Sequence, residues 1–154
     1  MEQDIDIYFM DIALELAKEA YLKDEVPVGA VLVDHKGNIV GKGYNQPISS
    51  LDPSAHAEIL ALREGAKRIN NYRLLDTTLY VTLEPCPMCA GAILYARVKR
   101  LVIGTLDPKT GACGSLYNIV SDKRFNHVVQ LTYGVRERQC SQILKEFFRQ
   151  RRHK

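Results

Sequence analysis

The chain has 154 residues, of which 46% are hydrophobic and 25% charged, with 10 Gly and 6 Pro. This composition is typical of one globular domain spanning residues 1–154, and it excludes two large domains and long disorder. The formal net charge is +3, yet residues 144–154 alone carry +4, which leaves −1 for the rest of the chain. A basic segment on a nearly neutral body indicates an anionic partner.

The sequence shows no run of the ~18–20 apolar residues that a membrane span needs. Its acidic start, MEQDIDIYF, lacks the basic and apolar regions of a signal peptide. We therefore expect a cytoplasmic protein without membrane attachment. In that reducing compartment, four cysteines favour metal binding or buried thiols over a disulfide framework.

The first part of the chain predicts a helix followed by a β-hairpin. Apolar side chains between residues 8 and 22 recur at spacings of three and one, as on a helix that lies on a sheet. Two apolar runs, 28–33 and 39–43, flank the turn signal Lys36-Gly37-Asn38.

The remaining sequence predicts further helices and strands in alternation. Asp52-Pro53-Ser54 offers capping residues and a proline suited to the first turn of a helix. The glycine-rich segment 107–115 predicts a loop. In chain order we expect a helix over about 54–68, a strand over 78–83, a short helix to about 96, and strands over 101–104 and about 128–132. A basic helix or tail over about 136–154 follows. This order indicates a three-layer α/β fold with a mixed sheet.

Two short clusters, His56-Ala57-Glu58 and Pro85-Cys86-Pro87-Met88-Cys89, stand where predicted helices begin. A Cys-x-x-Cys pair can direct two thiolates at one metal from a single turn, and a helix N-terminus lowers their pKa. Structural zinc normally has four protein ligands, whereas catalytic zinc keeps one position for water. His56, Cys86 and Cys89 therefore predict an open, catalytic site for one Zn²⁺ per chain.

Glu58 lies two residues beyond His56, about 200° around an ideal helix, so it is poorly placed to bind the same ion. A carboxylate beside the metal but outside its ligands can move protons to and from a zinc-activated water. We therefore predict that Glu58 is the general acid/base. Each cluster alone is a weak signal, since Cys-x-x-Cys also occurs in redox and structural zinc sites. Their order, H-x-E followed about 27 residues later by P-C-x-x-C, matches zinc-dependent base deaminases.

With these motifs the chain resembles the cytidine deaminase superfamily, and within it the bacterial deaminases that act on adenosine in tRNA. The resemblance implies a cytidine-deaminase-like α/β/α fold with about five strands, a homodimer, and hydrolysis of adenosine to inosine at the wobble position of a tRNA anticodon. It covers nearly the whole chain, through residues 25–33, 43–48, 52–63, 71–93, 107–116 and 147–152.

The resemblance also implies contacts with the RNA substrate. Asn45 would hydrogen-bond the purine, the backbone N–H of Ala57 would meet the base edge, Asp107 would contact a ribose hydroxyl, and Lys109 would approach a phosphate. A contact with the 2′-hydroxyl distinguishes RNA from DNA. From the residues alone, Asn45 is also compatible with a turn, Ala57 with a spacer at a helix start, and the loop that contains Asp107 with a mobile turn.

The predicted last helix has two interpretations. Its apolar stripe, Cys140 to Phe148, fits core packing. Phe148 also runs directly into arginines, and aromatic and arginine side chains together can stack unpaired bases and neutralise phosphates. We therefore expect Phe148, Arg149 and Arg151 to hold the anticodon stem-loop.

Two other functions compete with this interpretation. A deaminase of a free base or nucleoside, such as guanine, cytosine or cytidine, would use the same zinc chemistry but needs no basic tail. A zinc-stabilised RNA-binding protein without catalysis has no use for Glu58. A thioredoxin-type redox protein would leave both His56 and Glu58 without a role.

Overall fold

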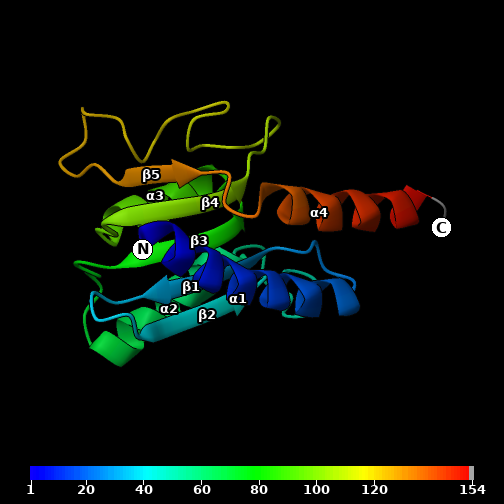
Figure 1. Ribbon diagram of the computed structural model, residues 1–154, viewed down its shortest axis with the longest axis horizontal. Helices are drawn as coiled ribbons and strands as arrows, with labels where there is room; N and C mark the ends of the chain where they lie inside the picture. The colour runs from blue at the N-terminus through cyan, green and yellow to red at the C-terminus, as the bar shows by residue number, and fades with distance from the viewer. Residues whose placement is uncertain (153–154) are drawn as a thin grey trace.

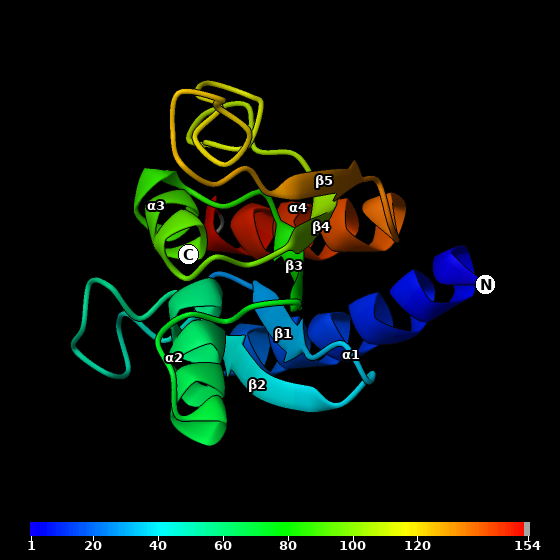
Figure 2. The same ribbon diagram turned by 90° about the vertical axis from the view of Figure 1, so that its left-hand side faces the viewer.

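The computed structural model describes residues 1–152, and it consists of a five-stranded sheet between two layers of helices (Figures 1 and 2). The strand order is β2-β1-β3-β4-β5. The strands are β1 (Gly29–Val33), β2 (Ile39–Tyr44), β3 (Thr78–Leu83), β4 (Arg100–Thr105) and β5 (Gln130–Tyr133). The helices are α1 (Glu2–Leu22), α2 (Ala57–Ile69), α3 (Pro87–Tyr95) and α4 (Glu137–Arg152). The predicted three-layer α/β/α fold with a mixed sheet is confirmed.

Strand direction brings the carboxyl-terminal ends of four strands, β2, β3, β4 and β5, to the same end of the sheet. β1 is antiparallel to both of its neighbours, β2 and β3, while β3, β4 and β5 are mutually parallel. β2 therefore runs in the same direction as β3 and β4. The segments that follow them begin with Asn45, Glu84 and Leu106, and α4 extends outward from this same end of the sheet (Figure 1). Ligand sites in open α/β sheets form at such carboxyl-terminal edges.

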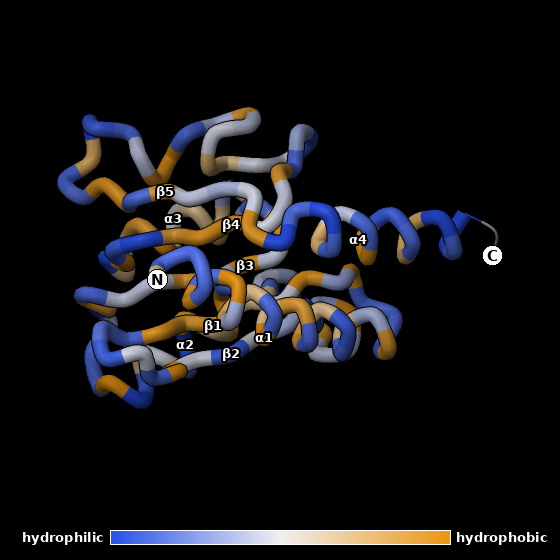
Figure 3. Tube along the Cα trace, in the orientation of Figure 1, coloured by the Kyte–Doolittle hydropathy of each residue, from blue (hydrophilic) through white to orange (hydrophobic). Residues whose placement is uncertain are grey.

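Each face of the sheet is covered by two helices. α2 and α3 pack on one face, and α1 and α4 on the other (Figure 2). Alternate strand residues therefore enter different cores: Leu79 and Val81 face α2 and α3, whereas Tyr80 faces α1. Burial on both faces explains why β1, β3 and β4 are mainly apolar along their length instead of alternating between apolar and polar residues (Figure 3).

The structure corrects two predicted helix starts. α1 begins at Glu2 instead of near residue 8, with two acidic residues in its first turn, where they interact favourably with the helix dipole. α2 begins at Ala57 and not at Ser54. The Ser54 backbone N–H donates to Asp52 Oδ1 at 2.9 Å, so the expected capping residues form a separate turn. His56 becomes the extended residue immediately before the helix.

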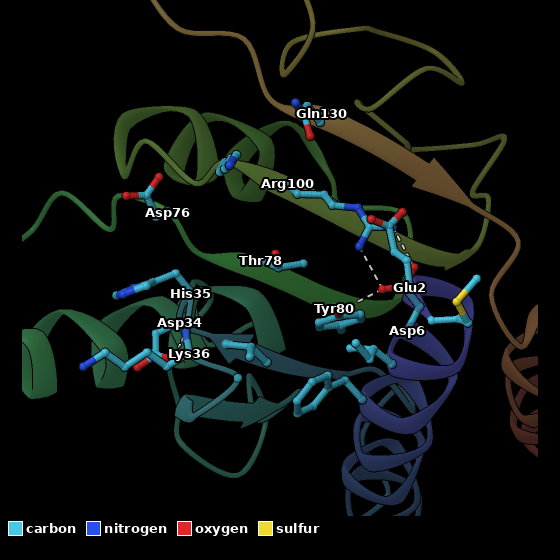
Figure 4. A pocket seen from close by; sticks show the side chains of 16 residues that line it. Glu2, Asp6, Asp34, His35, Lys36, Asp76, Thr78, Tyr80, Arg100 and Gln130 are labelled. Atoms are coloured by element: carbon cyan, nitrogen blue, oxygen red, sulfur yellow. Dashed lines mark hydrogen bonds and ion pairs between the residues drawn. The ribbon is translucent and has the colours of Figure 1, made fainter.

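A polar cluster closes the opposite end of the sheet, beside a cavity of about 790 Å³ (Figure 4). Arg100, the first residue of β4, donates from Nη1 and Nη2 to the two oxygens of Asp6 at 2.8 and 2.6 Å. The Tyr80 hydroxyl donates to Asp6 at 2.9 Å. These three side chains satisfy one another and tie α1 to β3 and β4.

Within residues 1–152, no helix has both the length and the apolar content that crossing a membrane requires. Residues 153–154 of the predicted basic segment lie outside the described residues.

Candidate active site

Three potential metal ligands converge from the starts of α2 and α3. His56 and Cys86 are the residues that immediately precede these helices, and Cys89 lies in the first turn of α3. Pro87 occupies the first turn of α3, where its missing N–H is not needed. His56 Nδ1 lies 3.6 Å from Cys86 Sγ and 3.4 Å from Cys89 Sγ, and all three ligand atoms lie within 4.8 Å of one another.

These distances fit one tetrahedral zinc ion. Zinc binds histidine nitrogen at ~2.0–2.1 Å and cysteine sulfur at ~2.3 Å, which separates nitrogen from sulfur by about 3.6 Å at the tetrahedral angle. The hydrogen bond from Cys89 and the nearby His56 lower the pKa of Cys86 to about 4, whereas the same hydrogen bond and burial raise the pKa of Cys89. The thiolate is the form that binds metal. The donor set therefore suits zinc and leaves one tetrahedral position for a fourth ligand.

Glu58 is a buried carboxyl group beside this cluster. It occupies the first turn of α2, is 4% exposed, and lies outside the group of three ligand atoms. Burial raises the pKa of Glu58 to about 7, and Cys86 and His56 are close enough to influence it. A carboxyl group with a pKa near neutrality can both accept and return a proton.

The N-terminus of α2 is tied to the end of β2. Asn45 Oδ1 accepts the Ala57 backbone N–H at 2.9 Å, so these two predicted base-binding groups contact each other. The Asn45 amide NH₂ is then the donor that remains for a ligand. The absence of a side chain at Gly43 lets α2 approach β2 closely. A Cβ at this position would lie only 2.3 Å from the Ala57 carbonyl oxygen.

Asp107 organises a turn at the start of the predicted substrate loop. Its carboxylate accepts the backbone N–H groups of Lys109 and Thr110 at 3.1 and 3.2 Å, and the Thr110 hydroxyl at 2.6 Å. The loop, residues 107–115, does not form a helix, and Cys113 near its end pairs with Asn118 in an isolated β-bridge. Cys113, expected in a flexible loop, is instead completely buried.

Two clefts adjoin Phe148 and bring most of the predicted RNA contacts together. A cleft of about 390 Å³ is lined by Asn45, Ile48 and Phe148, among others. A larger one of about 950 Å³ extends from the loop residues Asp107 and Lys109 to Phe148. Arg151 lines both clefts, whereas Arg149 lines neither and is exposed on the outer side of α4.

Comparison with known proteins identifies the family. Residues 3–105 match the family model described as the cytidine and deoxycytidylate deaminase zinc-binding region. The chain is also 56% identical to a tRNA-specific adenosine deaminase of Haemophilus influenzae, over 99% of this chain and 88% of that protein. The chain belongs to this zinc-dependent deaminase family. Zinc is therefore its metal cofactor.

Solved structures agree with the assignment of this chain to the deaminase family. A structure from a study of A-to-I editing by tRNA:A34 deaminases at the wobble position of transfer RNA superposes with a TM-score of 0.85 and 41% identity, covering 89% of this chain and 99% of that one. A guanine deaminase from Bacillus subtilis is 40% identical with a TM-score of 0.61, covering 64% of this chain and 63% of that one.

The two adjacent phenylalanines of the deaminase's C-terminal helix differ in burial. Phe147 is buried against Tyr21, with ring centroids 5.8 Å apart, whereas Phe148 is 48% exposed. The Arg151 guanidinium lies 4.5 Å from the centre of the Phe147 ring and donates to the Asp24 backbone carbonyl. Arg151 therefore holds α4 against the end of α1 in addition to lining the clefts.

Two buried glutamates of the deaminase were not predicted from the sequence. Glu25 is 1% exposed and accepts the backbone N–H groups of Ile48 and Ser49 at 3.2 and 2.7 Å, which fixes the wall beside Asn45. Glu84 is 2% exposed and binds the loop that begins at Asp107. The available signal was a charged residue that directly follows an apolar strand, for Glu84, or lies shortly before one, for Glu25.

Proposed function

We propose that this chain hydrolyses adenosine to inosine at the wobble position of a tRNA anticodon, in the cytoplasm. The observation that carries the chemistry is a buried carboxyl group, Glu58, beside a three-ligand cluster with room for a fourth ligand. Similarity over nearly the full chain to tRNA-specific adenosine deaminases, at 56% and 45% identity, supports the choice of substrate.

In this proposal His56, Cys86 and Cys89 hold one Zn²⁺. When bound, zinc lowers the pKa of a water molecule to about 7, so that hydroxide is available at neutral pH. Glu58 accepts the proton that this water releases and delivers it to N1 of the adenine as oxygen adds to C6. Glu58 then transfers the second oxygen-bound proton to the amino group, the C6–N bond breaks, and ammonia leaves.

The residues around the zinc cluster would bind the RNA. The Asn45 amide is positioned to hydrogen-bond the purine, and the Ala57 N–H, already bonded to Asn45, would have to be shared to reach the base edge. Asp107 would contact a ribose hydroxyl and Lys109 a phosphate. Phe148, Arg149 and Arg151 would hold the anticodon stem-loop. Residues 1–154 act as one deaminase domain in this proposal.

This function can be tested by incubating the zinc-loaded protein with tRNA that carries adenosine at the wobble position. The nucleosides of the tRNA are then analysed. We expect inosine to appear at that position. Parallel incubations with guanine, cytosine and cytidine test the alternative of a small-molecule deaminase. The similarity to guanine deaminase is the observation that favours this alternative. Turnover of a free base or nucleoside without turnover of tRNA would overturn the proposal.

Replacing Phe148 with alanine is expected to reduce kcat/KM for tRNA by about 5- to 150-fold, because stacking one base on an aromatic ring contributes about 1–3 kcal/mol. Phe147→Ala is the matched control, since that ring is buried against Tyr21. It should mainly lower the melting temperature. Equal effects of the two substitutions on both measurements would contradict a role for Phe148 in RNA binding.

Neutralising the exposed arginines of α4 should make tRNA binding less dependent on salt. Removing one cation that neutralises a phosphate reduces the slope of log K against log salt by about 0.7–0.9. We expect this reduction for Arg149→Gln and Arg152→Gln, measured by titration at several salt concentrations. Arg151→Gln should also loosen α4, because Arg151 binds Asp24 and covers Phe147. Unchanged slopes would show that the basic segment does not contact phosphates.

We also propose that the deaminase forms a homodimer. The helices α2 and α3 end beside large exposed side chains, among which Tyr72 and Tyr95 are 70% and 77% exposed. Exposed apolar patches of this kind commonly mark protein interfaces. A molar mass of one chain in sedimentation experiments at micromolar concentration would contradict the dimer.

A further inference from the structure

We propose that Glu84 is a positioning residue that fixes the substrate loop, residues 107–115, beside the zinc ligands and thereby controls affinity for RNA. Glu84 immediately follows β3 and precedes Pro85 and Cys86. The inference rests on the proposed function of Asp107 and Lys109 in RNA binding.

The Glu84 carboxylate is fully occupied by the loop. Its Oε1 accepts the Asp107 backbone N–H at 3.0 Å and the Ser115 hydroxyl. Its Oε2 accepts the backbone N–H groups of Cys113 and Ser115, both at 3.0 Å. An ionised carboxylate offers about four acceptor sites, so these contacts saturate it. Glu84 is therefore suited to hold the loop and not to carry protons or bind metal.

The backbone next to Glu84 strengthens the same connection. The Ala112 N–H donates to the carbonyl oxygen of Pro85 at 2.9 Å, directly before the zinc-ligand candidate Cys86. The loop is thus fixed to the segment that positions Cys86 through both backbone and side chain. A shift of the loop relative to the zinc cluster would break several buried hydrogen bonds at once.

Gly111 provides an independent indication that the loop is fitted around this carboxylate. A Cβ added at Gly111 would lie 2.3 Å from Glu84 Cδ and 2.4 Å from Oε2. Contacts this short cannot be accommodated without moving either the carboxylate or the loop. The absence of a side chain at Gly111 therefore lets the carboxylate reach its backbone donors.

Glu84 reaches the RNA-binding groups through Asp107. Glu84 fixes the backbone of Asp107, and the Asp107 carboxylate in turn fixes the backbone of Lys109 and Thr110. Between residues 106 and 129 the chain has no helix or named strand that could supply this rigidity. Loosening Glu84 should therefore cost ordering entropy when RNA binds, which raises KM more than it lowers kcat.

Glu84→Gln tests the proposal because it preserves shape but replaces one acceptor oxygen with an NH₂ donor. We expect KM for an anticodon stem-loop RNA to rise about tenfold, with kcat within about threefold of wild type and one zinc per chain. Gly111→Ala should shift KM in the same direction. Asp34→Asn is the matched control: Asp34 also accepts two backbone N–H groups, in the β1–β2 turn away from the site, so KM should not change.

Hydrogen exchange separates this inference from the proposed function. In the absence of RNA, the amides of Asp107, Cys113 and Ser115 should exchange faster in Glu84→Gln than in wild type, even if tRNA is not the substrate. Unchanged exchange, or unchanged KM in an active enzyme, would overturn the role of Glu84. If Glu84→Gln does not fold, Ser115→Ala is the second variant, because it removes only the hydroxyl contact. It should produce a smaller rise in KM than is expected for Glu84→Gln. An unchanged KM for Ser115→Ala would overturn the role of Glu84.

Discussion

Replacing Glu58 with alanine is expected to reduce adenosine deamination by about 10²- to 10⁴-fold, because the reaction then lacks the group that transfers protons to the base and the leaving amine. Zinc content should remain one per chain, since Glu58 lies outside the cluster of His56, Cys86 and Cys89. Single-turnover measurement of inosine formation, with zinc measured on the same samples, checks both expectations.

Two further variants make this result specific. Glu58→Gln keeps the size of the buried side chain but cannot accept a proton, so it should be as inactive as the alanine variant. Glu64→Ala changes an exposed glutamate on the same helix and should retain activity. If Glu58→Gln retained wild-type turnover, proton transfer would have to be assigned to another group. If Glu58→Ala lost its zinc, Glu58 would be a ligand or a structural support for the site.

Replacing Asp6 with alanine should lower the free energy of unfolding by about 3–5 kcal/mol, more than any other substitution considered above. The substitution leaves the Arg100 guanidinium, whose side chain is 15% exposed, without its bidentate partner, and it removes the acceptor of the Tyr80 hydroxyl (Figure 4). For a chain of this length the melting temperature should fall by about 10 °C. Urea unfolding and calorimetry measure the change.

Asp11→Ala is the matched control for Asp6→Ala. Asp11 also binds one arginine through two hydrogen bonds, from Arg136 Nε and Nη2 at 2.9 and 3.2 Å, but the side chains of this pair are 35% (Arg136) and 50% (Asp11) exposed. Exposed pairs contribute about 0–1 kcal/mol because water solvates and screens the charges. Similar losses for the two variants would show that burial of the Asp6–Arg100 pair does not determine its contribution.

The two motifs of the metal cluster could be predicted from sequence because each is local, whereas the approach of His56 to Cys86, 30 residues away, depends on the tertiary structure. Two cysteines three residues apart must lie near one another when a helix begins between them, and Glu58 lies in the first turn of the helix that His56 immediately precedes. Short apolar runs similarly predicted the strands of the central sheet. Helix starts were predicted less well, because Asp52 and Ser54 can cap a turn as readily as a helix.

The sequence by itself determined the fold class and the basic C-terminal segment, and it predicted the candidate zinc ligands and the candidate proton-transfer residue. Only the tertiary structure decided that Glu84 holds the loop 23 to 31 residues away, that Asp6 pairs with Arg100 94 residues away, and that Phe148 is exposed while Phe147 is buried. The physical reason is the separation along the chain between the residues that interact. Periodicity and short motifs report interactions within one helix or strand, whereas partners of buried charges depend on strand order and direction, which bring distant segments to the same edge of the sheet.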